Sequence, residues 1–249
     1  MKNFAYDFDD AVWLGEAKYC FQYYCTHAAV ILAGNQFLAD HASAYSKNVH
    51  IIPTSVNLNR YKQIELKRGA SFNVGWLGSS IGFAYFQPIE HQLLSFFEKH
   101  NDARLCIVAD RFPTELKLLS KYIDFYPWRM DEDVYRINNF DVGLMPLFDN
   151  DIERGKCSFK MLQYMACEIP VIVSAVGMNV DVIKKEKEYG HFGSLAFSHE
   201  GWAEWLNYYY AMPKMSLRKI GATGRRVIAD YYASEVIGKK ISKLFTRYL

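Results

Sequence analysis

Short apolar runs alternate with helical patterns throughout residues 71–198. Each run has the length and apolar content of a buried strand, and each segment between two runs repeats apolar residues three and four positions apart. Alternating strands and helices joined by short turns form right-handed βαβ crossovers, so this stretch predicts an α/β fold with a doubly wound parallel sheet, a Rossmann-like domain. The predicted strands are 72–77, 104–109, 122–126, 141–145, 170–174 and 194–197, and the predicted helices are 88–99, 114–120, 131–138, 157–167 and 179–185.

The chain on either side of this stretch has a different pattern. Residues 1–53 contain too few elements for a second complete sheet, so they are expected to be the end of a first Rossmann-like domain that is mostly absent, followed by a polar linker at 54–70. Residues 199–249 show only helical patterns and are expected to form C-terminal helices. The predicted elements outside the central stretch are strands at 29–33 and 49–52 and helices at 15–27, 35–46, 200–211, 216–232 and 234–248, with Asn35 as an N-cap.

The composition excludes several classes of protein. The 249 residues carry a net charge of +2, which gives no electrostatic case for a nucleic-acid partner. No stretch reaches the about 18 apolar residues of a membrane span and the first residues do not form a signal peptide, so a cytoplasmic location is expected. The five cysteines include no CxxC pair and the seven histidines show no metal-binding spacing, so reduced core thiols are expected and no metal site is predicted.

Three cations crowd the start of the predicted helix at 157–167. Arg154, Lys156 and Lys160 lie where the helix macrodipole disfavours positive charge by about 0.3–1 kcal/mol each, and the two lysines repel each other across one helical turn. Such a placement predicts an anion-binding site, with phosphate as the anion. The alternative is a solvated basic turn that is neutralised by the acidic residues between positions 149 and 153.

Two loops and one aromatic residue are further candidates, because ligands of an open parallel sheet bind beyond the carboxyl ends of its strands. The loop after the strand at 72–77 carries glycines that let backbone amides approach a phosphate and hydroxyls that can donate to it. The loop after the strand at 170–174 enters a helix, and its alternative role is that of a plain N-cap. Trp128 can face a nucleotide base or can serve only in packing. The candidate loop residues are Gly78, Ser79 and Ser80, and Gly177, Met178 and Asn179.

The order and spacing of these segments resemble one half of a known enzyme family. GWLGSS, YPW, DVGLMPL and RGKCSFKMLQYMACEIPVIVSAVGMN follow one another as in the C-terminal, donor-binding domain of the retaining family 4 glycosyltransferases (glycosyl transferases group 1). Upstream, YDFDDAVW and AVILAGNQFLADHA…VHIIPTSVN resemble the end of the family's N-terminal domain and its linker. The resemblance covers nearly the whole chain and implies a glycosyltransferase B-type fold, in which two Rossmann-like domains face a cleft.

The resemblance also implies an activity. Members of the family transfer a sugar from a nucleoside diphosphate sugar to a saccharide or lipid-linked acceptor, with retention at the anomeric carbon and without a metal ion or other cofactor, in polysaccharide or glycoconjugate biosynthesis. By this resemblance the loop at 78–80 and the three cations bind the donor diphosphate. Gln163 and Trp128 contact the ribose and the base, and the loop at 177–179 contacts the sugar.

The sequence departs from the family at two places. The family usually has two glutamates separated by seven residues around this helix, and the matching positions here are Gly155 and Gln163. The family often has an arginine and a lysine after the first strand of this domain; here Ser79 stands in place of the arginine and no lysine follows. The cations at 154–160 are expected to supply this charge from the other side of the site.

Two other functions compete with that of a transferase. Because most of the family's acceptor-binding domain is missing from the sequence, the chain is alternatively a nucleotide-sugar-binding module that needs a partner chain, or a second copy, on residues 1–53. A nucleotide-sugar epimerase of similar shape is a third hypothesis, weakened by the lack of evident acid–base residues. The basic tail at 239–245 is amphipathic, so it either touches the inner face of a membrane or, as we expect, packs back across the linker.

Overall fold

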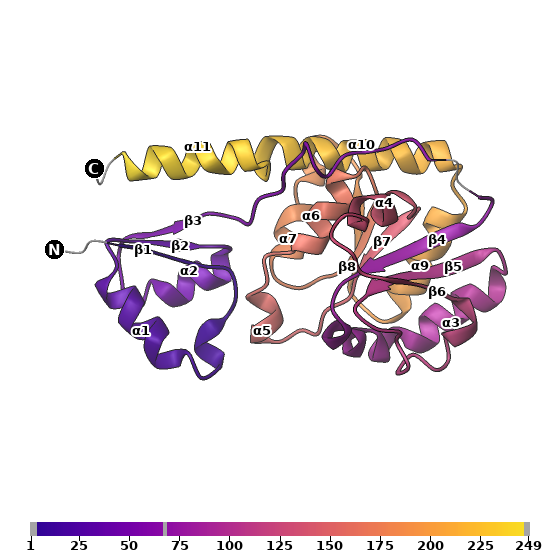
Figure 1. Cartoon of the computed structure of the whole chain (residues 1–249), viewed down its shortest axis with the longest axis horizontal. Coiled ribbons are helices and arrows are strands. Elements are labelled where there is room, and N and C mark those ends of the chain that lie inside the picture. Colours follow the sequence, from indigo (N-terminus) through magenta and orange to yellow (C-terminus); the bar gives the residue numbers. More distant parts are fainter. Residues whose placement is uncertain (1–3, 67–68, 247–249) are drawn as a thin grey trace.

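The protein contains a small parallel sheet and a large parallel sheet that lie next to each other, each covered by helices (Figure 1). The structure, a computed structural model, describes residues 4–66 and 69–246. Residues 1–3, 67–68 and 247–249, which belong to the predicted N-terminal segment, linker and last helix, lie outside the described residues. The predicted α/β fold with a doubly wound parallel sheet is confirmed.

The large sheet has six parallel strands, all of which fall on predicted apolar runs. These strands are β4 (Phe72–Leu77), β5 (Ala103–Ala109), β6 (Ile123–Pro127), β7 (Val142–Met145), β8 (Val171–Ser174) and β9 (Gly193–Ala196). Their order is β6-β5-β4-β7-β8-β9, so the chain adds strands on one side of β4 and then returns to add strands on the other side. The direction switches between β4 and β7, and ligands of open α/β sheets bind at the carboxyl ends of the strands at such a switch point.

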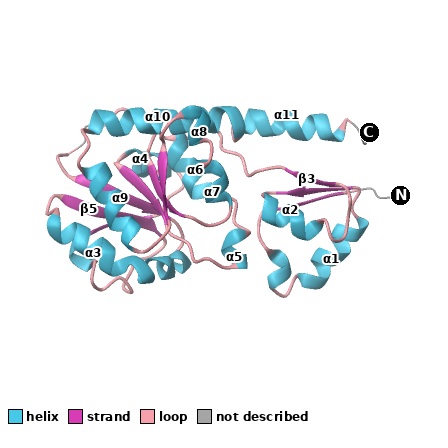
Figure 2. Ribbon diagram, turned by 180° about the vertical axis from the view of Figure 1, so that it is seen from behind, coloured by secondary structure: helices cyan, strands magenta, loops and turns pink. Residues whose placement is uncertain are grey.

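Helices cover both faces of the large sheet (Figure 2). One face carries the 3-10 helix η2 (Ser80–Ile89), α3 (Glu90–Lys99) and α9 (Glu200–Tyr210), and the other carries α4 (Asp133–Asn138), α6 (Phe159–Ala166), α7 (Met178–Ile183) and α10 (Lys214–Tyr231). Alternate strand residues point to opposite faces. In β5, for example, Leu105 and Ile107 belong to the apolar cluster of the first face, whereas Cys106 and Val108 belong to that of the second. The second cluster continues into the small sheet, so the two sheets share a core.

Two glycines let aromatic rings, one of them from α6, lie close to the large sheet. Gly75 in β4 and Gly143 in β7 are register partners. A Cβ atom on Gly75 would lie 2.0 Å from the ring of Phe140, and one on Gly143 would lie 2.4 Å from the ring of Tyr164 on α6. The buried Tyr164 hydroxyl accepts a hydrogen bond from the Leu77 backbone N–H at 2.8 Å. This packing fixes α6 against the carboxyl end of β4.

The small sheet has three parallel strands, and not the two that the sequence predicts. Its order is β1-β2-β3. The pattern does not reveal the first strand because Phe8 is its only buried residue and Asp7 interrupts its apolar run. The elements of this part are β1 (Ala5–Phe8), the 3-10 turn η1 (Val12–Leu14), α1 (Lys18–His27), β2 (Val30–Ala33), α2 (Gln36–Ala42) and β3 (Val49–Ile51).

Two long helices, α10 and α11 (Ser234–Phe245), run along the same side of both sheets (Figures 1 and 2). The linker meets the break between these helices, where Val56 and Ala233 form a β-bridge and the Val56 N–H donates to the Tyr232 carbonyl at 2.8 Å. On α10, the Arg225 guanidinium donates to the Tyr61 carbonyl at 2.9 Å. The linker is therefore held along α10 and carries Tyr61 toward the region between the sheets.

The apolar side of α11 faces the small sheet. Leu244 and Phe245 pack with Val30 and Leu32 of β2, so this part of the tail packs on the small sheet, whereas the sequence predicted packing across the linker. Among the helices that the structure describes, none is both long and apolar enough to cross a membrane.

Several predicted helices differ from the observed ones. The segment at 114–120 forms turns that lead into a single 3-10 turn, η3 (Ser120–Tyr122); its apolar spacing reflects the burial of Leu116 and Leu119 in a loop. Pro88 lies inside η2, because the chain continues as a 3-10 helix before α3 begins. The short helices α5 (Asp151–Arg154) and α8 (Glu186–Tyr189) are not predicted, because a helix of one turn has no measurable periodicity.

Asn35 ties the small sheet to the loop that precedes α6. Its Oδ1 accepts a hydrogen bond from the Leu38 N–H at 2.9 Å, which confirms the predicted N-cap of α2. Its Nδ2 donates to the Gly155 carbonyl at 3.0 Å and lies 3.2 Å from the carbonyl oxygens of Arg154 and Lys156. One buried side chain therefore caps a helix and joins the two sheets.

We expect Asn35→Ala to lower the free energy of unfolding by about 2–4 kcal/mol, because it removes a helix cap and leaves the buried Gly155 carbonyl without a donor. Asn35→Ser keeps an acceptor for the cap but cannot reach Gly155, so it should lose about 1 kcal/mol less. Urea unfolding of the two variants measures both losses. Unchanged stability in both variants would show that this amide does not hold the sheets together.

Candidate functional site at the junction of the two sheets

A cavity of about 480 Å³ lies between the two sheets. Leu77 at the end of β4 and Met145 at the end of β7 form part of its wall, together with the start of α6, and Asp9 and Thr54 line it from the small-sheet side. The cavity is therefore at the switch point of the large sheet, and its volume is typical of small-molecule sites.

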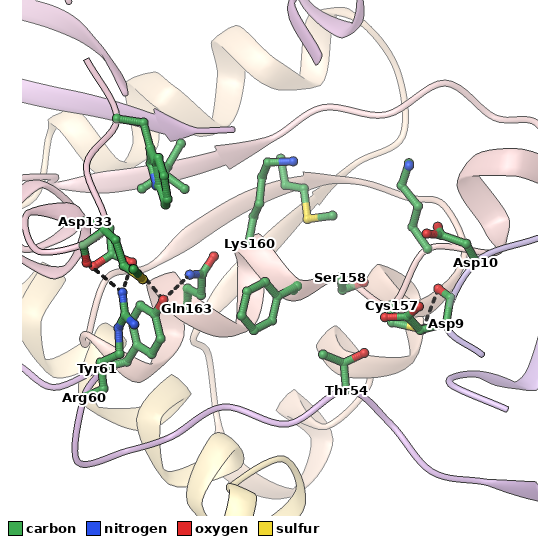
Figure 3. A pocket seen from close by; sticks show the side chains of 16 residues that line it. Asp9, Asp10, Thr54, Arg60, Tyr61, Asp133, Cys157, Ser158, Lys160 and Gln163 are labelled. Carbon is green, nitrogen blue, oxygen red and sulfur yellow. Dashed lines mark hydrogen bonds and ion pairs between the residues drawn. The ribbon is translucent and has the colours of Figure 1, made fainter. Parts of the chain in front are cut away.

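Polar side chains of different character follow one another along this cavity (Figure 3). A hydrogen-bonded network occupies one end, a lysine lies near the middle, and two carboxylates lie at the other end. In that order the residues are Arg60, Tyr61, Asp133 and Gln163; Lys160; and Asp9 and Asp10. The cavity thus offers hydrogen-bonding groups, positive charge and negative charge in sequence.

The network at the first end has a fixed direction of hydrogen bonding. Arg60 and the Tyr61 hydroxyl both donate to one oxygen of Asp133 at 2.9 Å. Gln163 Nε2 donates to the Tyr61 oxygen at 2.7 Å. Burial and the hydrogen bond to Asp133 raise the pKa of Tyr61 to about 12, so the hydroxyl stays protonated. Its only O–H is used in the hydrogen bond that it donates to Asp133. The other neighbour of Tyr61 must then be a donor, which explains a glutamine where the family has a glutamate.

Lys160 brings an uncompensated positive charge to the middle of the cavity. Its side chain is half-buried, its ammonium lies 5.6 Å from the centre of the Trp76 ring, and no carboxylate forms an ion pair with it in the described part of the chain. Burial and the nearby Lys156 charge lower the pKa of Lys160. An incoming anion would stabilise such a desolvated cation.

Lys156 lies between acidic groups at the carboxylate end of the cavity. Its ammonium is 3.7 Å from the Glu153 carboxylate, which is buried and accepts a hydrogen bond from the Tyr85 hydroxyl at 2.7 Å. Asp10 lines the cavity beside it. Burial raises the pKa of Asp10; the Lys156 charge partly offsets this, and neighbouring carboxylates add to it.

Arg154 does not share this position. Its guanidinium is exposed and pairs with Asp149 at 2.9 Å and with Asp151 at 3.2 Å. It does not line the cavity. The alternative of a neutralised surface turn therefore describes Arg154, while the structure brings Lys156 and Lys160 together.

The loop after β4 lies against Lys160 through its first glycine, Gly78, which does not itself line the cavity. A Cβ atom on Gly78 would lie 2.5 Å from Lys160 Cε, so the glycine leaves room for this side chain. The Gly78 N–H already donates to a carbonyl of β5 at 3.0 Å, and the Ser80 amide and hydroxyl both donate to Asp110. Neither Ser79 nor Ser80 lines the cavity. This loop shapes the site and positions Lys160.

The loop at 177–179 supports the start of α6. Asn179 is fully buried, accepts a hydrogen bond from the Ser158 hydroxyl at 2.7 Å and donates to the Ser174 carbonyl at 3.1 Å. Ser158 immediately precedes α6 and has a left-handed backbone, with φ of 56°. Gly177 has φ of 52° and Met178 is buried. None of the three loop residues lines the cavity.

Gly155 brings the loop before α6 into contact with the small sheet. A Cβ atom at this position would lie 2.8 Å from both the backbone nitrogen and the Cβ of Ala11. A glutamate would therefore force the sheets apart, which explains a glycine where the family has its other glutamate.

Trp128 lines the cavity near the hydrogen-bonded network, whereas most of the remaining lining residues were not predicted. The acidic pair follows β1 directly, so recognising that strand would have placed the pair at the carboxyl edge of a sheet. The residues of the linker and of α4 carry no comparable signal. The polar lining residues missed are Asp9, Asp10, Thr54, Arg60, Tyr61, Asp133 and Ser158.

Gln163→Glu should lower the free energy of unfolding by about 1–3 kcal/mol, because it places a buried carboxylate against an oxygen whose proton is already donated to Asp133. Adding Tyr61→Phe removes that oxygen, so a double-mutant cycle by chemical denaturation should show that part of the loss is recovered. A Gln163→Glu variant as stable as the wild type would contradict the assigned direction of these hydrogen bonds.

Comparisons with known proteins agree with this fold. Residues 81–205 match the family described as glycosyl transferases group 1. A search of curated proteins found no match. The fold is similar to that of Anabaena Alr3699/HepE in complex with UDP and glucose, with a TM-score of 0.77 and 14% identity over 97% of this chain and 71% of that chain.

Two further solved structures are similar over nearly the whole chain. A glycosyltransferase from Rickettsia africae ESF-5 has a TM-score of 0.77 and 15% identity over 98% of this chain and 70% of that chain. Sucrose-phosphate synthase from Thermosynechococcus elongatus has a TM-score of 0.69 and 16% identity over 98% of this chain and 67% of that chain. These similarities establish a shared Rossmann-like, glycosyltransferase B-type fold. With the family match over half of its length, the chain belongs to the glycosyl transferases group 1 family.

Proposed function

We propose that the chain is a retaining hexosyltransferase that takes a hexose from a nucleoside diphosphate sugar and attaches it to a hydroxyl of a saccharide or lipid-linked acceptor, without a metal ion, in polysaccharide or glycoconjugate assembly. The order of groups along the cavity carries this proposal. The hydrogen-bonded network comes first, the unpaired Lys160 follows, and the carboxylates come last. Trp128 also lines the cavity, and it precedes by two residues Met130, whose carbonyl accepts a hydrogen bond from Arg60 of the network. A donor presents its base and ribose, its diphosphate and its sugar hydroxyls in the same order.

Each part of the donor then has a partner of matching chemistry. Trp128 stacks on the base, and the Oε1 of Gln163 accepts a hydrogen bond from the ribose because its Nε2 is engaged with Tyr61. Lys160 and Lys156 bind the diphosphate through charge-assisted hydrogen bonds. At the far end the carboxylate of Asp10 accepts hydrogen bonds from sugar hydroxyls.

The chemistry required of these residues is stabilisation of the leaving group. The bond between the anomeric carbon and the diphosphate oxygen breaks, the acceptor hydroxyl oxygen forms the new bond to that carbon, and the hydroxyl proton passes to the departing diphosphate. Negative charge develops on the diphosphate as it leaves, and two fixed lysine ammonium groups in a partly desolvated cavity stabilise it there. The donor and acceptor lie on the same side of the sugar when the configuration is retained.

Lysine charge also replaces the usual role of a divalent metal in this proposal. Among the described residues, no group of three or more His, Cys, Asp or Glu side chains could hold a metal ion. Lys156 and Lys160 supply positive charge at the place where a diphosphate would lie. The Anabaena neighbour was solved with UDP and with UDP-glucose, so UDP is the first nucleotide to test.

Exposed aromatic residues on α1 favour a second candidate function, that of a donor-binding module completed by a partner chain. Tyr19 is 82% exposed, and Tyr23 and Tyr24 are also exposed on the same helix. Strand β1 is an edge of the small sheet. An exposed aromatic surface next to an open strand edge is suited to association.

We expect Lys160→Met to weaken UDP binding about 10- to 100-fold, the scale of a lost charge-assisted hydrogen bond of 1–3 kcal/mol. Lys156→Met should also weaken it, by a smaller factor because this lysine already pairs with Glu153. Arg154→Met is the control and should change the affinity by less than about threefold, since its charge is exposed and neutralised. Titration calorimetry measures all three. Equal effects at positions 154 and 160 would refute the assignment of Lys160 to the diphosphate.

Incubation of the purified chain with UDP-, ADP- and GDP-sugars and a panel of sugar and alkyl glycoside acceptors tests the activity itself. The expected outcome is release of the nucleoside diphosphate that EDTA does not abolish, with a product whose anomeric configuration, read by NMR, equals that of the donor. Donor binding without turnover would favour the module that needs a partner. An inverted product would overturn retention, and an epimerised donor would overturn the transferase.

A further inference from the structure

A second hollow, of about 470 Å³, adjoins the cavity just described. Asp10 and Lys156 line both, so the two spaces adjoin at these side chains. Asp10 and Lys156 also mark the end of the first cavity to which the sugar of a donor is assigned. A molecule in the second hollow would therefore lie next to that sugar.

The walls of the second hollow are aliphatic and come from both halves of the molecule. Ala11, Val12, Leu14 and Ala17 line it on the side of the small sheet, and Ile152 of α5 lines it on the other side. Leu14 is 47% exposed and Ile152 is 54% exposed, so large apolar side chains face solvent on opposite walls. Exposed apolar residues that converge on a hollow indicate a binding surface.

We propose that this hollow is the acceptor site, and that the acceptor carries an alkyl or similar apolar chain beside the hydroxyl that receives the sugar. The hydroxyl lies beside Asp10 and Lys156 with its proton toward the diphosphate, while the apolar chain lies between Leu14 and Ile152. This inference rests on the proposed function, because it identifies the second substrate of the same reaction.

The lining distinguishes this acceptor class from a plain saccharide. Sugar rings are bound by stacking on aromatic side chains and by many hydrogen-bonding groups, and no aromatic residue is among the described lining residues of this hollow. Its polar side chains are Asp10 and Lys156, shared with the first cavity, and Glu16. Asp10 and Lys156 lie on the side of the donor, and five of the other lining residues (Ala11, Val12, Leu14, Ala17 and Ile152) are aliphatic, as an amphiphilic acceptor requires.

The close approach at Gly155 creates this shape. Because Gly155 lies against Ala11, α5 and the turn around Val12 come near enough to form two walls of one hollow. The hollow therefore depends on the same contact that prevents a glutamate at position 155.

Octyl and methyl β-D-glucopyranoside are a suitable pair of probes, because they share a head group and differ only in the alkyl chain. Their binding to the full chain in the presence of saturating UDP is measured by ligand-observed NMR, below the concentration at which the octyl glycoside forms micelles. The variants are Leu14→Asn and Ile152→Asn in the hollow. Ile51→Asn, at an exposed isoleucine that lines neither space, is the matched control.

We expect the octyl glycoside to bind at least about 10-fold more tightly than the methyl glycoside, because its chain is buried. Each hollow variant should weaken octyl binding about fivefold or more. Ile51→Asn should change the affinity for the octyl glycoside by less than about twofold. All three variants should change the affinity for UDP by less than about twofold. If either Leu14→Asn or Ile152→Asn does not fold, the other variant provides the test of octyl binding.

Equal affinity of the two glycosides, absence of octyl binding, or hollow variants that bind the octyl glycoside like the wild type would each overturn the proposal. A separate titration of the wild type with UDP distinguishes this failure from failure of the donor site. If UDP does not bind, the proposed function falls, and the glycoside titrations repeated without nucleotide still report on the hollow.

Discussion

The geometry of the candidate site depends on one side-chain amide. Asn35 caps α2 with its oxygen and holds the loop before α6 with its nitrogen, so the small sheet and the start of α6 move together. Lys160 lies on α6 and Asp10 follows β1, and this contact therefore fixes the separation between the cation and the carboxylate. From the other side, Tyr164 fixes α6 to the large sheet. The distance between a phosphate bound at Lys160 and a sugar bound at Asp10 would thus be set by residues that contact neither of them.

The two departures from the family pattern follow from local constraints that only the folded chain displays. Gly155 has no space for a side chain because Ala11 lies against it, and Gln163 must donate a hydrogen bond because the Tyr61 hydroxyl uses its only proton in the hydrogen bond to Asp133. Each residue is therefore required by a neighbour that lies far away in the sequence. Their replacement by glutamate would restore the family pattern and destabilise this particular fold.

The sequence predicted what depends on local pattern and missed what depends on contacts between distant segments. Buried parallel strands are apolar on both faces, so all six strands of the large sheet stood out. Lys160 stood out because a cation is unfavourable at a helix start. Tyr61 reaches the site only through the path of the linker along α10, and Asp10 only through a strand with a weak pattern. Asn179 looked like a ligand residue, but its burial beneath α6 could not be read from a loop sequence.

The linker joins the two sheets covalently, and the C-terminal helices extend from the large sheet over the small one; the two cross at one place. The linker crosses at Val56 and the C-terminal helices cross at Ala233, and these two residues are bridged to each other. A rotation of one sheet against the other would therefore turn about this point, on the side of α10 and α11. Helix α5, at whose end Asn35 makes its contact, lies away from those helices in both views (Figures 1 and 2). Opening of the cleft would have to break the hydrogen bonds of Asn35 and separate part of the apolar core that the two sheets share, while the linker and its bridge to Ala233 would stay in place.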